Sequence, residues 1–146
     1  MIKVNVLESD KHWKKVLFNP SGYIKRKVSK LSKENVFFKK KNLEFSIVLA
    51  GTKEIKYLNK KFRNKDKSTD VLSFPFHEKV LLIKLLKKKN LNIYLGDIII
   101  NIKKIVFKNN LKAFQKELNK TWIHGLAHLM GGRHKSKKDF LIMNKV

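Results

Sequence analysis

Apolar and polar residues are arranged along the chain in a pattern that predicts four strands. Alternation from Ile2 to Leu7 predicts an edge or half-buried strand, and the apolar run from Leu43 to Ala50 predicts a buried one. The stretch Val71 to Phe76 predicts a third strand, and Pro75 indicates that it ends there or lies at an edge. A fourth strand is predicted from Ile93 to Ile100.

Helical patterns occupy much of the chain between these strands. The pair Asn19-Pro20 is typical of a helix start, since proline fits the first helical position. A short helix is predicted to begin at Gly51-Thr52. From Ile102 to Met130 the pattern is again helical, with a break expected near Asn109-Asn110.

Four remaining segments are polar or ambiguous. The lysine run 39–41 and the segment RNKDKSTD, residues 63–70, are predicted to be polar loops. Residues 78–90 are compatible with a mobile insertion or with an amphipathic helix, and 137–146 with a last short helix. With no internal repeat or linker, the order of elements predicts one compact α+β domain over residues 1–146, a small mixed β-sheet flanked by helices.

The composition of the chain indicates its cellular compartment and the class of partner to expect. The chain has 146 residues and no cysteine, and its start lacks the apolar core of a signal peptide. No apolar run approaches the length of a membrane span, so we expect a cytoplasmic protein with no membrane partner. The net charge of +24 favours a nucleic-acid partner. Most of the basic residues are lysines, however, and an AT-rich genome would produce the same bias.

The segment HGLAHLMGGRH, residues 124–134, carries the clearest chemical pattern. His124 and His128 are four residues apart, so they share one face of a helix. Gly131 and Gly132 allow the backbone to leave the helix and bring His134 back towards the pair. Three imidazoles with an open position for water are typical of a catalytic zinc site, so one Zn²⁺ ion is predicted.

The same spacing occurs in the metzincin peptidase signature H-E-x-x-H-x-x-G-x-x-H. Gly125 stands where that signature has the glutamate that acts as general base. A metallopeptidase is therefore the less favoured enzymatic alternative.

Further candidate residues are less distinctive on their own. Arg63 precedes a predicted strand and would suit a phosphodiester, although an arginine on a basic surface often has no specific task. Asp97, after a glycine in an apolar strand, is expected to accept backbone hydrogen bonds, orient a histidine or cap a turn. His12 and His77 are interpreted as surface or packing residues, and Trp122 as a core residue.

Three blocks together resemble the YbeY family of bacterial rRNA maturation endoribonucleases. The first is HGLAHLMGGRH, similar to the family pattern H-G-x-L-H-L-x-G-y-D-H. The second is LNKKFRNKDKSTDVLSFP, from Leu58 to Pro75, and the third is the G-D-I-x-I block from Gly96 to Ile100. The blocks occur in family order across a chain of family size.

The resemblance implies a zinc-dependent endoribonuclease specific for single strands. Such proteins act in 3′-end maturation of 16S small-subunit rRNA and in ribosome quality control. Residue by residue, His124, His128 and His134 would be the zinc ligands, and Arg63 the catalytic arginine that contacts RNA phosphate. The implied partners are rRNA or other single-stranded RNA, and the small ribosomal subunit with its proteins or assembly factors.

One departure from the family pattern keeps a second function open. Arg133 stands where the family has an aspartate directly before the third histidine, and Asp139 is a candidate to compensate. A non-catalytic RNA-binding assembly factor with a structural zinc is therefore the alternative. A structural zinc site usually has a fourth protein ligand, for which His77 is the candidate.

Overall fold

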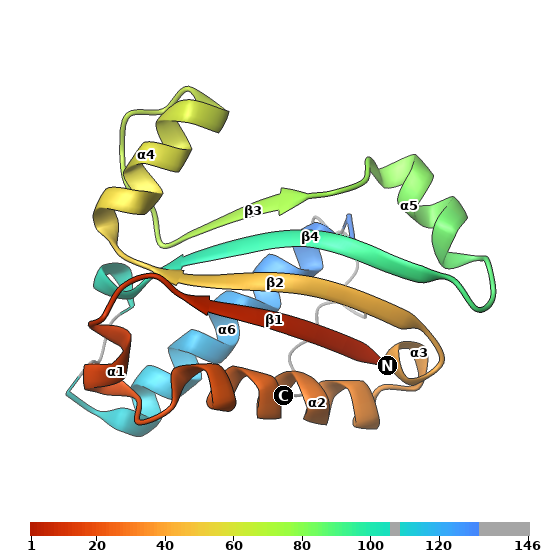
Figure 1. Cartoon of the computed structure of the whole chain (residues 1–146), viewed down its shortest axis with the longest axis horizontal. Helices are drawn as coiled ribbons and strands as arrows, with labels where there is room; N and C mark the ends of the chain where they lie inside the picture. Colours follow the sequence, from red (N-terminus) through yellow and green to blue (C-terminus); the bar gives the residue numbers. More distant parts are fainter. Residues whose placement is uncertain (106–108, 132–146) are drawn as a thin grey trace.

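Four strands form one mixed sheet in the order β1-β2-β4-β3 (Figure 1). A computed structural model of the chain describes residues 1–105 and 109–131. The strands are β1 (Ile2–Glu8), β2 (Asn42–Ala50), β3 (Val71–Pro75) and β4 (Asn92–Asn101). The pairs β1–β2 and β2–β4 are parallel, whereas β3 runs antiparallel to β4. The predicted α+β class with a small mixed sheet is confirmed, and β1 and β3 both lie at edges.

Helices cover both faces of this sheet (Figure 1). They are α1 (Trp13–Val16), α2 (Pro20–Glu34), α3 (Val36–Lys39), α4 (Thr52–Arg63), α5 (Lys79–Leu86) and α6 (Leu111–Leu129), with one 3₁₀ turn, η1 (Ile102–Lys104). Within the described ranges, none of these helices combines the length and the apolar character needed to cross a membrane.

The alternation of side chains along β2 divides the core into two parts. Phe45, Ile47 and Leu49 point into the larger core, which also contains the apolar faces of α2 and α6. Ala50 joins a smaller cluster with Ile55 of α4 on the opposite face. Helix α6 therefore lies on one face of the sheet and α4 on the other.

Several of the helices begin after an asparagine whose side chain caps the first turn. Asn19 Oδ1 accepts a hydrogen bond from the Gly22 amide, which confirms the predicted start of α2. Asn35 caps α3 in the same way, so Lys39 belongs to a helix, and the predicted loop at 39–41 is wrong at that residue. Asn110 caps α6 and confirms the predicted break.

Two further boundaries differ from the prediction. Helix α4 continues through Arg63 and ends at Asn64, which adopts a left-handed conformation with φ of 57°. Arg63 therefore lies in the last turn of a helix rather than in the polar loop. The predicted helix after β4 is limited to the 3₁₀ turn η1 in the described residues before 106. Residues 78–90 contain α5, which favours the helical alternative.

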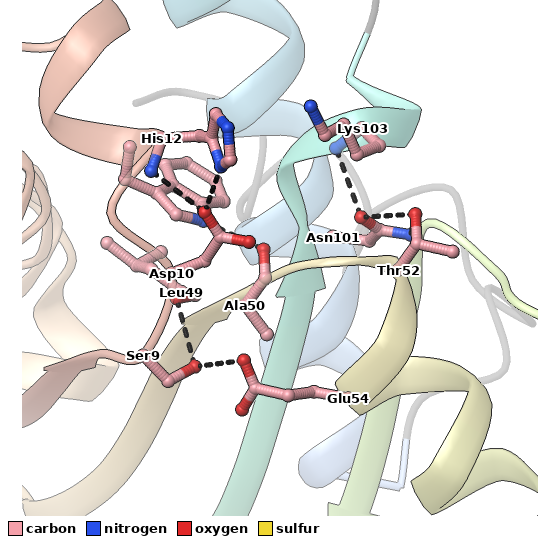
Figure 2. A network of polar contacts seen from close by, with 10 residues as sticks. Ser9, Asp10, His12, Leu49, Ala50, Thr52, Glu54, Asn101 and Lys103 are labelled. Carbon is pink, nitrogen blue, oxygen red and sulfur yellow. Dashed lines mark hydrogen bonds and ion pairs between the residues drawn. The ribbon is translucent and has the colours of Figure 1, made fainter.

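Asn101, at the end of β4, is hydrogen-bonded to Thr52 of α4 and to Lys103 of η1 (Figure 2). Its side chain is fully buried, and Nδ2 donates to the Thr69 carbonyl at 3.2 Å and to Thr52 Oγ1 at 3.3 Å. Its Oδ1 accepts from the Lys103 amide at 3.0 Å. Asn101 thus fixes the start of α4 and the loop that leads into β3.

The substitution Asn101→Ala should lower the free energy of unfolding by about 1–3 kcal/mol, because it removes a fully buried side chain and leaves partly buried backbone groups without their partners. Urea denaturation measures this change. Asn5→Ala is the matched control, since Asn5 is exposed and should change stability by less than about 0.5 kcal/mol. Equal losses in the two variants would contradict the role given to Asn101.

Candidate functional site

Two histidines near the end of α6 face each other. His124 and His128 lie one turn apart, as the i, i+4 spacing predicts, and both are half-buried. Their Nε2 atoms are 3.0 Å apart, and the ring centroids are separated by 4.5 Å. Helix geometry thus brings two imidazole nitrogens close together.

This separation suits a shared metal ion. Two nitrogens bound to one tetrahedral zinc at about 2.0–2.1 Å would lie roughly 3.3 Å from each other. The 3.0 Å between the two Nε2 atoms is close to that value, so little side-chain movement is needed. Imidazole is also a ligand that suits zinc, as it suits copper, iron and nickel.

Helix α6 ends directly after the pair. Gly131 adopts φ of 78°, and its amide donates to the His128 carbonyl at 3.0 Å, so the chain leaves the helix where the glycines predict. His134, Arg133 and Asp139 lie outside the described residues. In the ranges 1–105 and 109–131, no three acidic or histidine side chains form a metal-binding group. The three-histidine zinc site stays a prediction.

The histidine pair opens into a groove of about 770 Å³. Its walls come from three separate parts of the chain: the end of α6, the strand β3, and the turn that leads into α5. Arg63 of α4 completes it. The lining residues are Arg63, Asp70, Val71, Ser73, Pro75, Phe76, His77, Glu78, Lys79, Leu82, His124, His128, Leu129 and Gly131. Two of the family-like blocks in the sequence therefore meet in one cavity.

Arg63 reaches this groove around the free edge of the sheet. Its Nη2 donates to the Ser73 carbonyl at 3.0 Å, and its guanidinium carbon lies 5.8 Å from the centre of the Phe74 ring. In the part of the chain that the structure describes, no strand pairs with the outer side of β3, and Arg63 supplies a hydrogen bond to Ser73 there. The arginine predicted from sequence thus shares a cavity with His124 and His128.

Sequence reasoning placed His77 near the histidines only as the candidate fourth ligand of a structural zinc, and it did not place Glu78 at this site. Both line the groove, and His77 is half-buried, with its ring centre 4.9 Å from that of Phe76. Their position directly after the block that ends at Pro75 was the available signal. His12, by contrast, bonds to Asp10 near α1, and Trp122 is fully buried as predicted.

Asp97 has a partner that the sequence did not predict. It accepts a hydrogen bond from the Tyr94 hydroxyl, which also lies 2.6 Å from Ser46 Oγ. Burial, followed by the hydrogen bond to Asp97, raises the pKa of Tyr94 above its ordinary value. The phenol therefore stays protonated at neutral pH and continues to donate.

Gly125 lies where α6 packs closely against Ile98 of β4. A Cβ at this position would be 2.8 Å from Ile98 Cγ2 and 3.0 Å from Ile98 Cδ1. The residue therefore faces the sheet, and a larger side chain would push the helix away from β4. A glutamate, as in the peptidase signature, does not fit this space.

Comparison with known proteins agrees with this arrangement. The family model described as "Endoribonuclease YbeY" matches residues 9–146. The chain is 38% identical to the Endoribonuclease YbeY of Pelagibacter ubique over 99% of this chain and 91% of that protein. It is also 38% identical to the Endoribonuclease YbeY of Buchnera aphidicola, over 97% and 84% of the two chains.

A solved structure gives a similar result. The solution structure of TM1509 from Thermotoga maritima aligns with 98% of this chain and 85% of that one, with a TM-score of 0.60 and 27% sequence identity. The similarity extends over nearly the whole chain, and so includes the sheet and the helices that form the groove.

The substitution Gly125→Ala should lower the free energy of unfolding by about 1–3 kcal/mol, because the new methyl group overlaps Ile98. In an unconstrained helix the same change would stabilise by up to about 1 kcal/mol, so the sign is diagnostic. Urea denaturation of Gly125→Ala, Ile98→Ala and the double variant measures the coupling. The combined loss should be smaller than the sum of the two; additive losses would contradict the close contact.

Proposed function

The chain belongs to the YbeY endoribonuclease family, and we propose that it cleaves single-stranded regions of small-subunit rRNA in a zinc-dependent reaction. The observation that carries this proposal is the meeting of His124, His128 and Arg63 in one groove. A metal ion held by this pair and the guanidinium in the same groove would suit a phosphodiester, because both would stabilise negative charge on phosphate oxygens.

The proposed zinc ligands are His124, His128 and His134. When bound, the ion would supply a Lewis acid for a phosphate oxygen and lower the pKa of a coordinated water towards about 7. The side chains that line the groove would orient the RNA around this ion. The half-buried histidines hold their nitrogens at one point, and the packing of Gly125 against Ile98 keeps their helix in place.

Arg63 is the proposed catalytic residue that contacts the phosphate. Its guanidinium carries five N–H donors in a fixed plane, so the bond to the Ser73 carbonyl orients it while other donors reach the substrate. Charge that develops on the phosphate during cleavage would be stabilised most by this group. Lys79 on the groove wall and the net charge of +24 attract the RNA backbone in a salt-dependent manner.

The biological setting follows from the family. We propose that the substrate is the 3′ end of 16S rRNA during maturation of the small subunit, with a role in ribosome quality control, and that ribosomal proteins or assembly factors present it. The alternative, a non-catalytic assembly factor with a structural zinc, remains because Arg133 replaces the family aspartate. It predicts RNA binding without cleavage.

Replacement of a proposed metal ligand provides the first test. His128→Ala should reduce both zinc affinity and cleavage of labelled single-stranded rRNA at least about 100-fold, more than the loss of an outer-shell partner usually costs. Zinc content is measured by mass spectrometry, and His12→Ala is the matched histidine control. If wild-type protein and both variants bind RNA equally and none cleaves it, the assembly-factor alternative is correct.

The shape of the guanidinium provides a second test. Arg63→Lys keeps the charge but removes the planar fork, so cleavage should fall by roughly 10²–10³-fold while RNA affinity changes much less. Single-turnover rates and binding isotherms separate the two effects, and a thermal melt shows whether β3 is still held. Arg26→Lys on α2 is the control. Full activity in Arg63→Lys would contradict a catalytic role for this arginine.

A further inference from the structure

An aromatic side chain is exposed inside the same groove. Phe76 follows β3 directly and is 66% exposed, although it lies among residues that line the cavity. An exposed phenylalanine beside histidines and an arginine cannot be explained as part of the apolar core. It is a flat apolar surface in a groove that also contains the basic side chains of Arg63 and Lys79.

The ring is held from behind by two other aromatic groups. The centroid of Tyr94 lies 5.6 Å away at an interplanar angle of 89°, and that of His77 lies 4.9 Å away at 86°. Such edge-to-face contacts stabilise a ring in one orientation. The Phe76 amide also donates to the Leu95 carbonyl at 3.0 Å, which fixes the backbone beneath the ring.

Tyr94 is itself fixed in place. Its hydroxyl donates to Asp97 and lies 2.6 Å from Ser46 Oγ, so the tyrosine is anchored to β2 and to its own strand. The contact with Tyr94 therefore restricts the movement of the Phe76 ring. The side chain would lose little conformational entropy when a ligand packs on its exposed surface.

We propose that Phe76 is a stacking platform for a nucleobase of single-stranded RNA, next to the phosphate at Arg63. The inference rests on the proposed nuclease function and names a base-binding subsite for it. Exposed aromatic rings in basic grooves bind single strands, because every nucleobase has a flat π surface. Ser73, whose carbonyl holds Arg63, is three residues before Phe76, or roughly 10 Å along an extended strand. That separation suits nearby nucleotides of one strand.

This platform would give a physical reason for preferring single strands. A base in a duplex is paired and stacked on its neighbours, so it must leave the helix before it can lie on Phe76. An unpaired nucleotide meets no such cost. The groove would therefore distinguish single-stranded from duplex RNA by whether a base face is free to stack, and not by the base sequence.

The test is binding of a short single-stranded RNA that contains one 2-aminopurine, whose fluorescence is quenched when the base stacks. Full-length protein is titrated into the RNA in the presence of a chelator, so that cleavage does not interfere. Phe76→Leu keeps an apolar side chain without a π surface, whereas Phe76→Trp keeps the platform. Phe18→Leu is the matched control, because Phe18 is 102% exposed and lies outside the groove.

Wild-type protein and Phe76→Trp should quench the probe and bind with similar affinity. Phe76→Leu should lose the quenching and bind between about fivefold and about 150-fold more weakly, whereas Phe18→Leu should behave as wild type. If Phe76→Leu does not fold, an RNA with a single abasic nucleotide tests the same contact on wild-type protein, and its affinity should fall by a similar factor.

The outcomes separate this proposal from the nuclease proposal. Quenching by wild-type protein that never cleaves RNA would support the platform and contradict the nuclease. Unchanged affinity and quenching in Phe76→Leu, with RNA cleavage intact, would overturn the platform alone. Absence of RNA binding by the wild-type chain would overturn both.

Discussion

The close contact between α6 and β4 at Gly125 is the constraint on which the site depends. Because this position has no side chain, the helix can lie directly against Ile98, and the neighbouring turn carries His124 and His128 towards β3. β3 pairs with β4 in the same sheet, so this packing contact helps to set the distance between the histidines and the opposite wall of the groove. A larger residue at position 125 would change the distance between the histidines and β3 without altering the reactive side chains themselves.

The opposite wall is β3, an edge strand of the sheet, and an edge strand exposes unpaired backbone N–H and C=O groups. Arg63 of α4 reaches across this edge and donates a hydrogen bond to the Ser73 carbonyl. Asn101 holds the preceding loop through the Thr69 carbonyl, and its own amide bonds to the Asp70 carbonyl at 2.8 Å. The groove thus contains residues from elements on both faces of the sheet. Arg63, which is proposed to bind phosphate, also stabilises β3 through its hydrogen bond to Ser73.

Local chemistry explains which features the sequence could predict. The starts of α2 and α6 follow from Asn19 and Asn110, whose side chains cap the first turn, and the histidine pair follows from helical spacing. Arg63 was misplaced because Asn64, not Arg63, takes the left-handed conformation that ends α4. The sequence placed His77 near the histidines only in the structural-zinc alternative. It did not place Phe76 there, because the inclusion of Phe76 in the groove depends on antiparallel pairing at the sheet edge. The third histidine stays a prediction from spacing and family resemblance.

The central claim is that this groove cleaves RNA with the help of a metal ion, and one measurement on the wild-type chain tests it most directly. Purified protein is stripped of metal, and cleavage of a labelled single-stranded fragment of small-subunit rRNA is followed as zinc is added. The account predicts that cleavage is absent without metal and reaches its maximum at about one zinc ion per chain, as expected for a single catalytic site. Intact RNA in the presence of one bound zinc per chain would contradict it.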